Sequence, residues 1–168
     1  MTARALTVSY AALWAATAAG AALARAGIHI ITAPAPRDAL QPTLDTAMAL
    51  VAHNSLVVLW PLALVLLGWP TLTGVRRLGD GLIAAQLLAH GSLVGTALGQ
   101  HPDTWRYLPH LPLEWLAIAT PAAAWLTART PHPGCPIGTS LAVLRLAAAC
   151  VAVLLGAAAI ETYLVPIT

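Results

Sequence analysis

Charge is what this sequence has least of. Only 8% of its 168 residues are charged, its basic residues other than histidine are all arginine, and phenylalanine is absent. A soluble domain carries about 25% charged residues, so this chain cannot cover a globular surface with groups that face water. With 59% hydrophobic residues and a mean hydropathy of +0.79, it is typical of a protein that lies in a lipid bilayer. The net charge of +2 is also too small to indicate a nucleic-acid partner.

Catalytic and redox motifs are equally scarce. The two cysteines, Cys135 and Cys150, have neither a metal-binding nor a redox spacing. The zinc-protease pattern H-E-x-x-H does not occur. Three serines lie in apolar stretches without a nucleophile-elbow motif, namely Ser55, Ser92 and Ser140. The sequence therefore favours a non-enzymatic protein; no cofactor is predicted, and the question of a metal stays open.

What the chain has in abundance is long apolar sequence. About 20 apolar residues cross a bilayer as a helix, and five segments approach or exceed that length, at residues 6–31, 44–69, 82–100, 112–128 and 139–164. We predict an all-α membrane protein, a bundle of about five transmembrane helices that forms a single polytopic domain over residues 1–168. The third predicted span follows a short charged segment with Arg76, Arg77 and Asp80, which we expect to be a loop.

Two of these spans leave alternatives open. The first could be a signal peptide, because Arg4, an apolar run and then Ala22-Leu23-Ala24 resemble a cleavable leader of residues 1–24. The fourth is short and contains Pro121, so it could be kinked, re-entrant or tilted. Pro61 predicts a kink in the second span.

Arginine placement indicates the orientation. Four arginines fall on the side of the N-terminus (Arg4, Arg76, Arg77 and Arg129) and two in the opposite loops (Arg37 and Arg106). Cytoplasmic loops carry an excess of basic residues. We therefore predict a multi-pass protein of the bacterial cytoplasmic membrane with its N-terminus inside and its C-terminus outside.

Glycines recur every four residues in the third span, at Gly91, Gly95 and Gly99. Small residues at this spacing form a ridge that lets a second helix approach closely. We interpret this ridge as a helix-packing surface.

Ionisable and amide side chains interrupt the apolar segments at several points. With alternating spans and a rise of about 1.5 Å per residue, six of them fall within roughly 15 Å of the outer surface: His53, Asn54, His90, His110, Glu114 and Glu161. Such residues inside a membrane mark either a functional site or a mutual structural pairing. Imidazole and carboxylate are also zinc ligands. We expect a polar cluster, with His110 and Glu114 on one face of the fourth helix.

Four ordered stretches, from about Ala47 to Pro166, carry a resemblance to a known family. They are His53-Asn54 before the apolar run to Leu67; Ala89 to Gly99, with His90 before the first glycine; Pro109-His110-Leu111-Pro112-Leu113-Glu114; and Ile160-Glu161 followed by Pro166. In their order they resemble the stage II sporulation protein M family of bacterial integral membrane proteins. That family usually has asparagine at the position of His90 and glycine at the position of Leu111.

The resemblance implies a polytopic bacterial membrane protein. In sporulating members of the family it also implies a link to localising peptidoglycan hydrolases during engulfment. Our leading hypothesis is a non-enzymatic scaffold or partner subunit of an envelope complex, with the lipid bilayer and other membrane or envelope proteins, or a second copy of the chain, as partners. The alternatives are a transport or permeation component with an intramembrane Glu/His site, and an intramembrane metal-dependent hydrolase.

Overall fold

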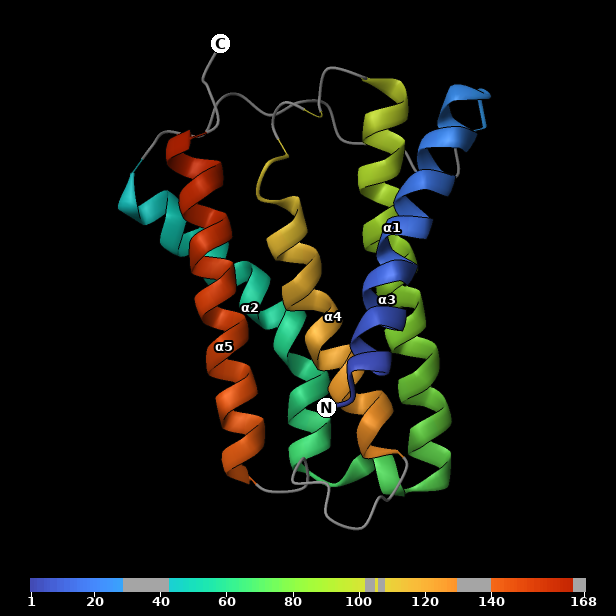
Figure 1. Cartoon of the computed structure of the whole chain (residues 1–168), viewed down its shortest axis with the longest axis vertical. Coiled ribbons are helices and arrows are strands. Elements are labelled where there is room, and N and C mark those ends of the chain that lie inside the picture. The colour runs from blue at the N-terminus through green and yellow to red at the C-terminus, as the bar shows by residue number, and fades with distance from the viewer. Residues whose placement is uncertain (29–42, 102–104, 106–107, 130–139, 165–168) are drawn as a thin grey trace.

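The computed structural model describes residues 1–28, 43–101, 105, 108–129 and 140–164. These residues form an all-α fold, as predicted, with five α-helices: α1 (Ala3–Arg25), α2 (Leu44–Leu66), α3 (Thr73–Gln100), α4 (Leu111–Ala128) and α5 (Ser140–Ala159). A short 3-10 helix, η1 (Trp69–Thr71), joins α2 to α3, and a π-helical turn, η4 (Ile160–Leu164), continues α5. Successive helices run up and down one bundle (Figure 1).

Local sequence explains where the first two helices begin. The hydroxyl of Thr2 accepts a hydrogen bond from the backbone N–H of Ala5, and that of Thr43 accepts one from the N–H of Thr46, each at 3.2 Å. Threonine at this position satisfies an N–H group that has no partner within the helix. Both helices end earlier than the predicted spans, at Arg25 and Leu66, although residues 29–31 of the first span lie outside the described residues.

The third helix is longer than its predicted span. It begins at Thr73, so the expected loop with Arg76, Arg77 and Asp80 is in fact its first two turns. Charged side chains do not by themselves end a helix, because its backbone hydrogen bonds are made within the helix. The carboxylate of Asp80 contacts Trp125 and Arg129. The turn lies earlier, where Gly68 adopts a positive φ of 72° that other residues disfavour.

Four of the five helices are long and apolar enough to cross a membrane: α1, α2, α3, and α5 with its π turn. Their outer faces carry large apolar side chains exposed from the bundle, among them Leu56, Leu88, Leu141 and Leu144. Apolar surface on this scale marks contact with lipid or with other apolar protein. The chain is therefore a multi-pass helical membrane protein.

α4 differs from the other four because protein surrounds it. It packs against α1, α2 and α5, and its two tryptophans, Trp115 and Trp125, are buried. It runs from the end of α3 to the opposite end of the bundle, where α5 begins (Figure 1). It continues as α-helix through Pro121 and measures about 27 Å at 1.5 Å per residue. The segment is therefore one continuous helix that runs from one end of the bundle to the other and not a re-entrant segment, and neighbouring helices cover most of its surface.

The glycine ridge of α3 faces α1. A Cβ at Gly91 would lie 2.7 Å from the carbonyl oxygen of Leu13, and one at Gly99 would lie 2.7 Å from that of Ala21. A Cβ at Gly95 would meet the carbonyl oxygen of Thr17 even more closely. Any side chain larger than hydrogen would therefore push the two backbones apart.

Candidate functional site

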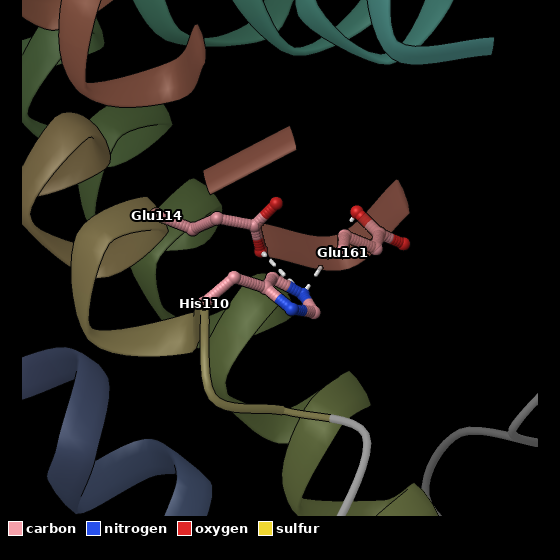
Figure 2. A group of neighbouring side chains, drawn as sticks. All are labelled: His110, Glu114 and Glu161. Carbon is pink, nitrogen blue, oxygen red and sulfur yellow. Dashed lines mark ion pairs between the residues drawn. The ribbon is translucent and has the colours of Figure 1, made fainter. Parts of the chain in front are cut away.

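Three ionisable side chains meet at the end of the bundle where α4 begins and α5 ends. His110 precedes the first residue of α4, Glu114 lies in its first turn, and Glu161 lies in η4. The Nε2 atom of His110 is 3.9 Å from Oε2 of Glu114 and 3.9 Å from Oε2 of Glu161. Figure 2 shows both carboxylates turned toward the imidazole ring. We call these three residues the His–Glu–Glu centre.

The start of α4 explains how His110 and Glu114 come together. The carbonyl oxygen of His110 accepts hydrogen bonds from the N–H groups of Leu113 and Glu114, at 2.9 and 3.2 Å. His110 is thus the N-cap residue, and Pro112 occupies the first turn, where its missing N–H removes no helical hydrogen bond. The positive end of the helix dipole favours the Glu114 carboxylate at this place.

Glu161, the third residue of the centre, lies where the helix type changes. From Ile160 to Leu164 the backbone widens from α-helical to π-helical geometry. One-turn π segments are uncommon and occur often at functional sites. In this chain the π turn carries Glu161, which lies against His110 rather than on a face of regular α-helix.

An amide side chain from another helix holds the Glu114 carboxylate. Nδ2 of Asn54 on α2 donates a hydrogen bond to Oε1 of Glu114 at 3.2 Å. The other oxygen, Oε2, is the one nearest His110. The two carboxylate oxygens therefore have different partners, which fixes the orientation of the group.

A cavity of about 110 Å³ lies beside the centre. Its polar lining residues are Asn54, His90, Glu114 and Trp115, and its apolar ones come from α2, α3, α4 and α5. The indole Nε1 of Trp115 is buried with no hydrogen-bond partner among the described residues. A cavity of this size, with polar groups in a mainly apolar wall, is large enough for water or a small ligand.

The ring of His90 has a defined tautomer at this cavity. Its Nδ1 lies 2.9 Å from the carbonyl oxygen of Gln86, one turn earlier on α3. A carbonyl oxygen only accepts, so Nδ1 must carry a proton, and Nε2 of the neutral ring is then an acceptor.

Five of the six predicted polar residues lie at or beside the centre, and the sixth does not. His110, Glu114 and Glu161 form the centre, Asn54 binds it, and His90 lines the adjoining cavity. His53 is exposed and does not belong to the centre or the cavity lining. Sequence reasoning missed Trp115, whose only signal was its position next to Glu114 in a buried helix.

A second polar group joins α3 to α4 at the opposite end of the bundle. Oδ1 of Asp80 accepts a hydrogen bond from Nε1 of Trp125 at 2.8 Å and lies 2.7 Å from a guanidinium nitrogen of Arg129. A Cβ at Gly79 would collide with the indole ring of Trp125. This group fixes how the end of α4 packs, and about a third of each charged side chain is exposed.

The arrangement limits what the His–Glu–Glu centre can do. Two partly buried carboxylates beside one buried imidazole favour sharing a proton or binding a cation, because unpaired charge in an apolar bundle is unfavourable. Among the described residues, His110 is the ion-pair partner of both carboxylates. Proton transfer and cation binding are the chemistries that such a group supports.

Comparison with known proteins adds no relative. No family model, no curated protein and no solved structure matches this chain. What the fold and composition establish is a multi-pass helical membrane protein.

Proposed function

We propose that this chain is a partner-dependent, non-enzymatic subunit of a bacterial envelope complex, similar to the stage II sporulation protein M family. The observation that supports the proposal is a convergence in space. The resemblance rests on stretches spread over the sequence, and a residue from each of them lies at one place: Asn54, His90, His110 with Glu114, and Glu161. A purely structural ion pair needs two helices, whereas these residues come from four.

The exterior of the bundle is suited to such a role. Its large exposed apolar residues lie on the helices that surround α4, so lipid or partner helices can pack there. The polar centre lies close to one end of the bundle, where a partner can reach it. The membrane partner and the envelope location both follow from the resemblance and are part of the proposal.

Recovery of partners from native membranes tests this function. The chain is purified in mild detergent after in vivo crosslinking, as wild type, as Glu161→Gln, and as Asp45→Asn, a matched control at an exposed acid in the first turn of α2. We expect the same partner to be recovered with wild type and Asp45→Asn but not with Glu161→Gln. Recovery of the wild-type chain alone, under several growth conditions, would contradict the proposal.

The cavity favours a second candidate function, namely permeation of protons or small cations. It lies between the helices and is bordered by Glu114, the residue shared with the centre. A chain of this size is too short for an internally duplicated transporter, so permeation would require an oligomer or a larger complex. Proteoliposomes with wild-type protein should then show ion flux that Glu114→Gln abolishes. Equal flux in both would exclude this route.

A further inference from the structure

We propose that His110, Glu114 and Glu161 bind one divalent transition-metal ion of the zinc class. Each side chain offers one ligand atom, and the three atoms all lie within 4.8 Å of one another. The two distances from Nε2 of His110 to the carboxylates are equal, at 3.9 Å. This site goes beyond the partner function and does not depend on it.

The spacing of the three atoms fits a metal of this class. An ion at the centre of such a triangle lies roughly 2.3–2.5 Å from each atom, and zinc bonds to nitrogen and oxygen at about 2.0–2.2 Å. Both carboxylates are at the ends of flexible glutamate side chains. Small rotations of those side chains close the remaining few tenths of an ångström.

Charge also favours a divalent ion. Two ionised carboxylates carry two negative charges, and a protonated His110 would balance only one of them. His110 is 95% buried, since its exposed fraction is 5%, and its Nδ1 has no hydrogen-bond partner among the described residues. A divalent cation bonded to Nε2 balances both carboxylates and gives the buried ring a strong interaction.

The ligand types narrow the choice of metal. Calcium and magnesium take oxygen ligands, whereas imidazole suits zinc and the later first-row metals. One imidazole with two carboxylates therefore indicates zinc; iron(II), which also binds imidazole, and manganese, which favours carboxylates, are its competitors.

The surroundings supply the other parts of such a site. Asn54 orients the Glu114 carboxylate in the way that residues around metal ligands commonly do. Three protein ligands leave a fourth position, and Glu114 also borders the cavity. Three ligands with an open position are typical of zinc sites that bind water or a small ligand.

Metal content of the purified chain is the direct test. The protein is prepared in mild detergent without a histidine tag, loaded with Zn²⁺, passed over a weak chelating resin and measured by inductively coupled plasma mass spectrometry. We expect close to one zinc per chain in wild type and background levels in His110→Ala and Glu161→Gln. His53→Ala and Asp45→Asn, which alter an exposed histidine and an exposed acid, should keep the metal.

Two further readouts decide the case if a variant fails to fold. Wild-type protein should unfold several degrees higher with Zn²⁺ than with chelator, because a ligand that binds only the folded state stabilises it. Co²⁺ should produce the visible absorption of a low-symmetry N/O site in wild type. No metal above background in wild type, or unchanged metal in a folded Glu161→Gln, would overturn the site. Because these measurements use the purified chain, a negative result leaves the partner function standing.

Discussion

At the scale of single residues, the helical period explains which polar side chains reach the centre. Adjacent helical residues point about 100° apart, so His53 and Asn54 cannot both face α4. Asn54 faces inward and bonds to Glu114, whereas His53 is exposed. The sequence alone identified the pair as polar but could not tell which member faced the protein, because α2 is apolar on nearly all sides.

The hydrogen bond from Asn54 is the residue-scale contact whose effect can be isolated. We expect Asn54→Ala to leave the fold intact and to weaken Zn²⁺ binding by about 10- to 100-fold, because the Glu114 carboxylate loses the group that orients it. Isothermal titration in detergent measures the affinity. Ser55→Ala, at the next position of α2, serves as the control and should bind as wild type does. Equal affinities for Asn54→Ala and wild type would show that this contact does not orient a ligand.

At the scale of elements, the sequence identified the apolar helices well and their ends poorly. Arg76, Arg77 and Asp80 suggested a loop, since a span was expected to exclude charge, but they belong to α3, and Asp80 bonds to Trp125 of α4 and to Arg129 just after its end. The π turn at Ile160–Leu164 was not foreseeable, as nothing in its composition distinguishes it from α-helix. Both features carry a side chain that contacts another helix or its end, Asp80 in the first case and Glu161 in the second.

The packing of α1 on α3 gives an element-scale prediction. We expect Gly95→Ala to destabilise the bundle by about 1–3 kcal/mol, the usual effect of overpacking, because the new methyl group meets the backbone of Thr17 and Ala21. Thermal unfolding followed by tryptophan fluorescence measures the change. The control is Gly81→Ala in the same helix, where an added Cβ has no atom within 4 Å.

Gly81→Ala should be neutral or stabilising by up to about 1 kcal/mol, since alanine favours helix more than glycine does. The two variants add the same methyl group to the same helix and differ only in what that group meets. If Gly95→Ala unfolded at the same temperature as Gly81→Ala, the close approach of α1 and α3 would be refuted.

At the scale of the whole molecule, α4 is the helix whose place in the fold was least predictable from its sequence. Its sequence shows a short, proline-marked segment with a carboxylate, which left re-entrant, kinked and tilted forms open. In the fold it is the central helix, and protein rather than lipid covers most of it. A helix enclosed in this way can carry Glu114 and two prolines, because the neighbouring helices cover its polar groups.

Whether α4 crosses the membrane decides whether the start of α1 and the end of α5 face the same side of it. The five helices alternate in direction along the bundle (Figure 1). If all five cross the membrane, the number of crossings is odd, and we expect the start of α1 and the end of α5 on opposite sides of it. From the arginine distribution we expect the start of α1 to lie on the cytoplasmic side. We therefore expect an N-terminal fluorescent-protein fusion to fluoresce and a C-terminal alkaline phosphatase fusion to be active outside. If the N-terminal tag were outside and the C-terminal tag inside, only the predicted orientation would be wrong. If both tags were on the same side of the membrane, α4 would not cross it.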